Sequence, residues 1–239
     1  MLKLTPILLA FVYAFLMYRF SVWRTQKMLD QNSRPLREPG LQPVLERLAR
    51  ALDLPSIHVH VFQVDPVNGL AAPDGRIFLT EGFLRKFRAG LVSADEIASV
   101  IAHELGHVAL GHTRRRMIDF TGANAVFVML TALLARFIPF IGIWIAQMVS
   151  AALMARLSRR DEFEADAYAS ALLIKAGIGT EPQKSLLAKL GRLTGAQGSP
   201  PAWLMSHPPT PDRVAAIEGN EARWLRRSTR SATATPRRR

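Results

Sequence analysis

The chain of 239 residues contains no cysteine. A disulfide scaffold, a thiol nucleophile and a cysteine-ligated zinc site are therefore excluded, and any metal site must use His, Asp and Glu side chains. Glycine and proline number only 15 each, and charged residues make up 21% of the chain against 49% hydrophobic ones. This balance excludes collagen-like and largely disordered chains, and it predicts a folded protein with one main domain.

Acidic residues are fewer than basic ones, 19 against 31, and they are missing from the C-terminal segment 223–239, which holds seven arginines. We expect this segment to be a disordered basic tail that is attracted to anionic lipid headgroups. A nucleic-acid binder is the weaker alternative, because attraction to phosphate alone carries no sequence information. No specific nucleic acid is expected as a partner.

Long hydrophobic runs are few. The first covers Leu4 to Met17 and continues less purely to Trp23, with no small-residue cleavage site after it. It favours an uncleaved membrane anchor over residues 1–23, with a cleaved signal peptide or a buried helix as alternatives. Basic residues are more frequent after the run than before it, so the bulk of the chain is expected on the cytoplasmic side of a bacterial-type inner membrane.

The second run covers Ala123 to Leu153 and is interrupted by Arg136, Pro139 and Gly142. Its 31 residues lie between the about 20 that one membrane span needs and the about 40 that two need. We therefore predict two short helices that break near 136–142 and are embedded in or re-enter the membrane. A soluble core hairpin remains the alternative.

The remaining patterns predict an α+β domain, mainly helical, over residues 24–222. Apolar residues recur at helical spacing from Val44 to Leu52, and they alternate with histidines at the start of the segment Ile57 to Val64. A second strand is predicted for Arg76 to Thr80, after a Pro-Asp-Gly turn.

A helix that begins after Ser93 carries the clearest chemical motif. Ser93 and Glu96 form a capping-box pattern directly before an apolar helical stripe. His103 and His107 are four residues apart on this helix, so both project from one face and can share a metal ion. Glu104 completes the HExxH arrangement, in which a carboxylate takes a proton from the water that attacks the substrate while the two imidazoles hold zinc.

Two histidines do not complete a zinc site, so a third ligand is needed. Position 113 is a threonine, which excludes the metzincin pattern. His112 lies about 140° around the helix from His107, so it is expected to point away from the metal as an exposed or capping residue. Glu162 and Asp166 share a helix face further along the chain, whereas Glu164 should face elsewhere. We therefore expect Glu162 to bind zinc and Asp166 to accept the second N–H of a ligand imidazole.

The segment Ala94 to His112, the acidic run 162–166, and Ser206 to Pro209 with Arg213 together resemble the membrane-associated gluzincin metallopeptidases, the superfamily of HtpX-like and CAAX prenyl proteases. The resemblance covers most of the chain and implies a zincin-type fold and one zinc ion per chain. It implies metal ligands at His103, His107 and Glu162, and Glu104 as the catalytic base. It also implies that His207 acts near the zinc as a gate or oxyanion stabiliser, with Arg213 supporting it, and that Asp166 supports a metal ligand.

The same resemblance implies a zinc metalloendopeptidase with polypeptide substrates and membrane lipids as partners, acting in protein quality control. The small number of hydrophobic runs argues against the substrate class of the many-helix prenyl proteases for this chain. The substrate-binding candidates are Asn68, in the stretch before the expected edge strand, and Ile77, Phe78 and Leu79 of that strand, which would hold an extended substrate by edge pairing.

One alternative function and two further interpretations of short segments remain. A non-catalytic membrane adaptor with the same fold is the main alternative function, although the retained Glu104 argues against it. His58 and His60 are a competing metal pair, since alternate residues of a strand face the same way. The arginines 114–116 are expected to meet lipid headgroups or the C-terminal dipole of the preceding helix.

Overall fold

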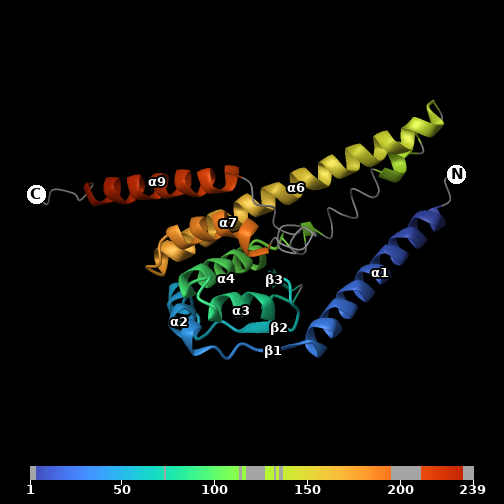
Figure 1. Ribbon diagram of the computed structural model, residues 1–239. Coiled ribbons are helices and arrows are strands. Elements are labelled where there is room, and N and C mark those ends of the chain that lie inside the picture. The colour runs from blue at the N-terminus through green and yellow to red at the C-terminus, as the bar shows by residue number, and fades with distance from the viewer. Residues whose placement is uncertain are drawn as a thin grey trace, which may run out of the picture.

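The structure is a computed structural model that describes residues 4–72, 74–112, 115–116, 127–131, 133–134, 137–194 and 211–233. Helices predominate, and a small sheet packs against one of them (Figure 1). The elements are α1 (Leu4–Gln31), β1 (Ser33–Pro35), η1 (Pro39–Leu41), α2 (Gln42–Ala51), β2 (Val59–Phe62), β3 (Gly69–Ala71), β4 (Ile77–Thr80), α3 (Glu81–Arg88), α4 (Ala94–Ala109), α6 (Pro139–Lys175), α7 (Glu181–Thr194) and α9 (Pro211–Thr233). The predicted α+β, mainly helical fold is confirmed.

The four strands lie in the order β1-β2-β4-β3. β2 and β4 are parallel, whereas β1 and β3 pair with them in the antiparallel direction. The two predicted strands correspond to β2 and β4. The expectation that residues 77–79 form a sheet edge is wrong, because β3 pairs with the outer side of β4. The edge strand on the α4 side of the sheet is therefore β3.

α4 is the central helix of the core, and its predicted start is confirmed. The Ser93 hydroxyl accepts a hydrogen bond from the Glu96 N–H at 3.2 Å, and the Glu96 carboxylate accepts one from the Ser93 N–H at 2.8 Å. The same carboxylate accepts from Ser185 and Lys189 on α7 at 2.7 and 2.6 Å. The capping hydrogen bonds, together with the contacts of the other Glu96 carboxylate oxygen to α7, fix the direction in which α4 enters the core.

α6 packs closely against α4, and Gly106 permits this approach. A Cβ atom on Gly106 would lie 3.1 Å from both the Cα and the carbonyl oxygen of Ala165. Such distances are tighter than ordinary van der Waals contact, so a larger residue would push the helices apart. The glycine thus brings residues 103–107 of α4 opposite residues 162–166 of α6.

The second apolar run folds as a helical hairpin within the residues described. Residues 127–131 and 133–134 are helical, the chain turns at 137–138, and α6 then begins at Pro139. The predicted break near 136–142 is confirmed. The prediction that the second helix is short is wrong, because α6 continues for 37 residues to Lys175. One uninterrupted helix therefore carries both the apolar run and the predicted ligand Glu162.

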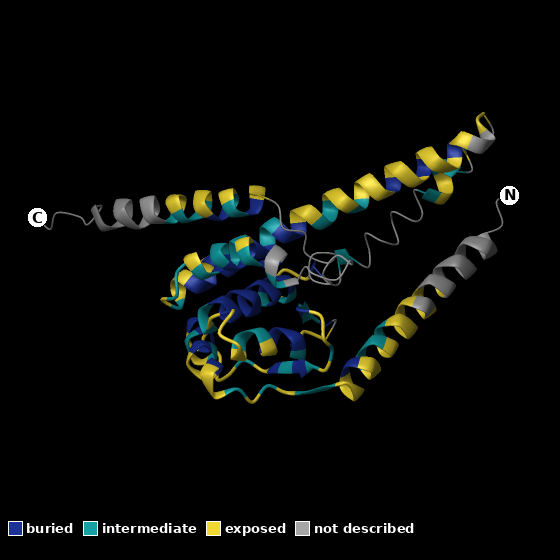
Figure 2. Ribbon diagram, viewed as in Figure 1, coloured by how far each residue is buried: buried dark blue, intermediate teal, exposed yellow. Residues whose placement is uncertain are grey.

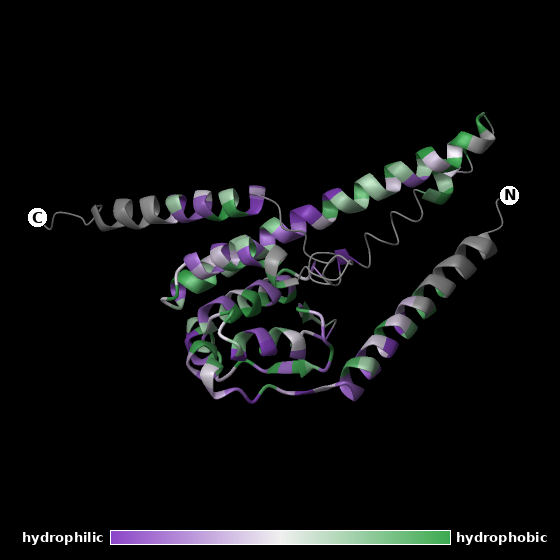
Figure 3. Ribbon diagram, in the orientation of Figure 1, coloured by the Kyte–Doolittle hydropathy of each residue, from purple (hydrophilic) through white to green (hydrophobic). Residues whose placement is uncertain are grey.

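The N-terminal half of α6 extends away from the rest of the protein (Figure 1). It is largely exposed and largely apolar (Figures 2 and 3), with Trp144 and Met148 exposed to 70% and 71%. Among the described helices, Ile141–Lys175 is long and apolar enough to cross a membrane, by length and composition alone.

The two ends of the described chain also form helices. α1 continues past the expected anchor segment 1–23 to Gln31, and its buried Leu29 packs against Phe78 of the sheet. α9 runs to Thr233, so residues 223–233 are helical where the sequence predicts disorder. The remaining tail residues, 234–239, lie outside the described residues.

Candidate metal centre

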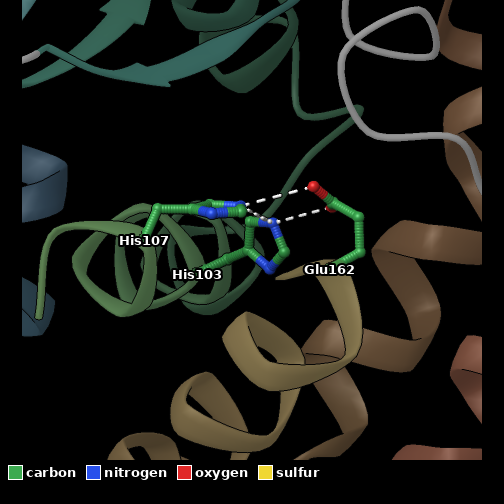
Figure 4. A group of neighbouring side chains, drawn as sticks. All are labelled: His103, His107 and Glu162. Carbon is green, nitrogen blue, oxygen red and sulfur yellow. Dashed lines mark hydrogen bonds and ion pairs between the residues drawn. The ribbon is translucent and has the colours of Figure 1, made fainter. Parts of the chain in front are cut away.

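The structure brings His103, His107 and Glu162 together between α4 and α6. The His103 and His107 Nε2 atoms are 3.1 Å apart. The Glu162 carboxylate oxygens lie 3.2 Å from His103 Nε2 and 3.5 Å from His107 Nε2. Figure 4 shows both rings and the carboxylate pointing toward one another, and all three side chains are buried.

This spacing fits a metal ion. Ligand atoms at about 2.1 Å from a tetrahedral zinc lie about 3.4 Å from one another. The three separations, from 3.1 to 3.5 Å, bracket that value. Two neutral imidazoles and one carboxylate are also the donor set of catalytic zinc sites, which leave a fourth position open.

His103 is held from behind by Asp166. Its Nδ1 lies 3.0 Å from the Asp166 carboxylate, so the imidazole can present Nε2 to a metal. Burial acts to lower the pKa of His103, but the hydrogen bonds and negative charges of Asp166 and Glu162 outweigh it and raise that pKa to about 9. Metal binding at Nε2 would therefore displace a proton.

Arg213 of α9 supports the same residues. Its guanidinium donates two hydrogen bonds to Asp166, at 2.6 and 2.8 Å, and Nη1 lies 3.5 Å from Glu162. Arg213 is itself buried, so its positive charge compensates carboxylates that would otherwise be costly to bury. The sequence expectation links Arg213 to His207, which lies outside the described residues.

Glu104 lies on α4 beside strand β3. Its side chain is buried, and a Cβ atom on Gly69 would lie 3.5 Å from Glu104 Oε1 and 2.6 Å from Val100. Only a glycine at position 69 lets β3 pass so close to the helix. The edge strand and the expected catalytic carboxylate are thus neighbours.

The expected substrate-binding residues have different positions. Ile77, Phe78 and Leu79 are buried in the central strand β4, so their expected role at a sheet edge is wrong. Asn68 directly precedes β3, and its backbone N–H donates to the Thr80 hydroxyl at 2.9 Å. Its side-chain oxygen is buried and has no hydrogen-bond partner within the described residues.

The expectation that His112 is an exposed or capping residue is wrong. It is fully buried, and its Nδ1 lies 2.9 Å from Nδ1 of His107. The helical angle fails because α4 ends at Ala109 and Gly111 adopts a φ of +67°, which turns the chain back toward the core. The glycine was the available signal, because it marks a helix end before position 112.

The arginines after α4 contact carboxylates of α6. Arg115 donates to Asp161 and Glu164 at 3.2 and 3.0 Å, and Arg116 donates to Glu162 at 2.7 Å. The expectation of lipid headgroups or a helix dipole as their partners is wrong for both, and position 114 lies outside the described residues.

The alternative histidine pair does not gather further ligands. His58 is exposed and lies 3.3 Å from the Ser56 hydroxyl, whereas the His60 ring lies 5.2 Å from that of Phe78. Burial and the nearby Arg76 charge lower the pKa of His60. In the part of the chain that the structure describes, neither belongs to a group of side chains that could hold a metal.

A buried HExxH helix that faces a carboxylate on a second helix is the arrangement of a metallopeptidase. The model of Peptidase family M48 matches residues 35–221, and the chain belongs to this family. It is a metalloprotease.

Three relatives illustrate the match. The protein named Protease HtpX of Pseudomonas paraeruginosa is 28% identical, covering 78% of this chain and 74% of its own length. Metalloprotease LoiP of Escherichia coli is 26% identical, covering 74% and 68%. Mitochondrial metalloendopeptidase OMA1 of Schizosaccharomyces pombe is 28% identical, covering 70% of this chain and 46% of its own.

Proposed function

We propose that the protein is a zinc-dependent endopeptidase. The observation that carries this proposal is the convergence of His103, His107 and Glu162 at zinc-ligand spacing, with Glu104 next to the first histidine. A non-catalytic adaptor would need at most the metal ligands. The retained Glu104 therefore favours the enzyme.

The chain's own residues account for the proton movements of peptide hydrolysis. His103, His107 and Glu162 would hold the zinc, which when bound supplies a Lewis acid that polarises the scissile carbonyl and acidifies water. Glu104 takes a proton from the attacking water on its carboxylate and then donates it to the leaving amine. Asp166 and Arg213 keep the His103 ring oriented throughout.

Strand β3 offers the place for an extended substrate. It is the sheet edge beside Glu104, and a polypeptide can add to such an edge through backbone hydrogen bonds. Recognition through the backbone does not require a particular sequence, so unfolded polypeptides are the substrate class that fits best. We propose a role in protein quality control from this substrate class.

We place the protein in a membrane, with membrane lipids as its partners. The exposed apolar half of α6 supports this, since it carries Ile141, Trp144 and Met148 on its surface. Arg156 and Arg159 follow on the same helix and would meet the lipid headgroups. The distribution of basic residues around both apolar segments favours the cytoplasmic side for the catalytic domain.

Purified full-length protein in detergent tests the enzyme directly. Wild-type protein should contain close to one zinc per chain and cleave casein. Glu104→Gln should retain the zinc but lose about 10²–10⁴-fold in cleavage rate, because the general base is removed. Glu46→Gln is the matched control, since Glu46 is an exposed carboxylate on α2, and it should cleave at the wild-type rate.

Two results would reject the proposal. Zinc-loaded wild-type protein that cleaves no unfolded polypeptide would favour the adaptor. Cleavage that survives Glu104→Gln undiminished would show that a different site performs the reaction.

A further inference from the structure

The two ligand histidines have different partners behind the metal site. His103 Nδ1 faces the Asp166 carboxylate at 3.0 Å. His107 Nδ1 instead faces Nδ1 of His112 at 2.9 Å, and His112 Nε2 lies 3.1 Å from the Glu164 carboxylate. His112 thus stands between the second ligand and an acidic residue that does not itself reach the site.

The direction of these hydrogen bonds follows from the requirement of metal binding. A ligand imidazole uses the lone pair of Nε2, so the proton of His107 must lie on Nδ1, which donates to His112. His112 then accepts at Nδ1 and carries its own proton on Nε2, which donates to Glu164. Each ring nitrogen has one role, and neither histidine needs to be charged.

The far end of this chain of hydrogen bonds is fixed from two sides. The Glu164 carboxylate accepts from Arg160 at 2.8 Å and from Arg115 at 3.0 Å. His112 is fully buried and can therefore adopt few other positions. Because Arg160 lies on α6 and Arg115 follows α4, the anchor also links the two helices that supply the metal ligands.

We infer that His112, held by Glu164, is a positioning residue that orients the His107 imidazole for the metal as Asp166 orients that of His103. The inference rests on the proposed zinc site and adds to it a residue outside the HExxH motif. It also explains why the chain turns back at Gly111, since the turn delivers His112 to the back of the His107 ring.

A second metal ion is the competing interpretation of this cluster. His112, Asp161 and Glu164 have potential ligand atoms within 4.8 Å of one another. A metal ion on His112 Nε2 would, however, move the His112 proton to Nδ1, which lies 2.9 Å from Nδ1 of His107. When His107 binds zinc through Nε2, its Nδ1 also carries a proton, so two N–H groups would face each other. The two metal sites therefore disfavour one another, which favours the positioning role.

Zinc affinity of the full-length protein, measured by competition with a chromophoric chelator, tests the inference. His112→Ala should weaken zinc binding about 10–100-fold, the effect expected of an outer-shell partner of a ligand. His112→Asn should restore most of the affinity, because its amide oxygen takes the place of Nδ1. His112→Gln should restore less, because its amide reaches the position of Nε2, beside Glu164.

The absorption spectrum of the cobalt-substituted protein gives a second readout. It should change in His112→Ala and His112→Gln but remain close to wild type in His112→Asn, because the spectrum reports the orientation of the ligands. His58→Ala, at an exposed histidine, is the matched control and should leave both affinity and spectrum unchanged. If His112→Ala does not fold, the comparison of Asn with Gln decides alone.

The possible failures are distinguishable. Equal zinc affinity and equal cobalt spectra for wild type, Asn and Gln would overturn the positioning role while leaving the zinc enzyme intact. A second zinc per chain that disappears in the His112 variants would replace the positioning role with a second metal site. Wild-type protein that binds no zinc would overturn the proposed function together with this inference.

Discussion

The two halves of α6 have the same secondary structure and opposite surroundings. Up to about Leu153 the helix exposes large apolar side chains, whereas from Asp161 onward it buries carboxylates that are paired with arginines and histidines. The first half exposes apolar side chains and the second half buries charged ones, and neither arrangement is favourable for a protein surrounded by water alone. An exposed apolar surface indicates contact with another apolar phase, and a buried acidic one indicates a binding site.

Among substitutions in the buried half of α6, Glu162→Gln is expected to have the largest effect. Loss of the charged ligand should lower zinc affinity by more than about a hundredfold, since even partners of ligands contribute up to that factor. Zinc content and casein cleavage are the measurements. Membrane association should be unchanged, and a protein that kept its zinc would show that Glu162 is not a ligand.

The exposed half can be tested in lipid because the chain has no cysteine of its own. Trp144→Cys, in protein reconstituted into vesicles, should react with a water-soluble maleimide about tenfold or more slowly than Leu91→Cys, since a thiol in hydrocarbon does not ionise. Leu91 is an equally apolar, 51% exposed residue before α4. Equal labelling rates would assign the hairpin to the aqueous phase.

A substitution at the contact between α4 and α6 is expected to have a smaller effect than those above, and the effect is on stability. Gly106→Ala should lower the free energy of unfolding by about 1–3 kcal/mol, because its Cβ has no room against Ala165. Gly219→Ala on α9, where a Cβ would meet open space, should raise it by up to about 1 kcal/mol. Urea unfolding of both variants measures the pair, and equal effects would contradict the close packing.

The pH dependence of zinc binding tests the buried half of α6 without any substitution. Because the pKa of His103 is raised to about 9 from its ordinary 6.5, zinc must displace a proton near neutral pH. Apparent affinity should therefore rise about tenfold per pH unit up to about pH 9. The metal-free protein should in turn lose stability from about pH 6.5 to 9. Chelator titrations that show no pH dependence would contradict a protonated His103.

The sequence predicted the parts of the site that follow helical periodicity. The capping box at Ser93 predicted where α4 begins, and the four-residue spacing then placed His103 and His107 on one face of it. The same four-residue spacing placed Glu162 and Asp166 on one face of α6, where they do contact His103. These inferences needed only local geometry, which a single sequence contains.

The features that were missed depend on where a helix ends or on pairing between distant segments. His112 follows the positive φ of Gly111, so the helical angle no longer applies to it. β3 has only three residues, too few for an alternating pattern, yet it makes β4 an interior strand. The length of α6 was missed because the charged residues after Leu153 interrupt the hydropathy without interrupting the helix.

The uninterrupted α6 also has a mechanical consequence. A continuous helix of 37 residues is a stiff rod about 55 Å long. Glu162 lies nine residues beyond Leu153, the last of the large exposed apolar residues of this half, and so stands about 14 Å further along the axis. With the apolar half in lipid, this stiff helix would fix the height above the bilayer at which a polypeptide is cut.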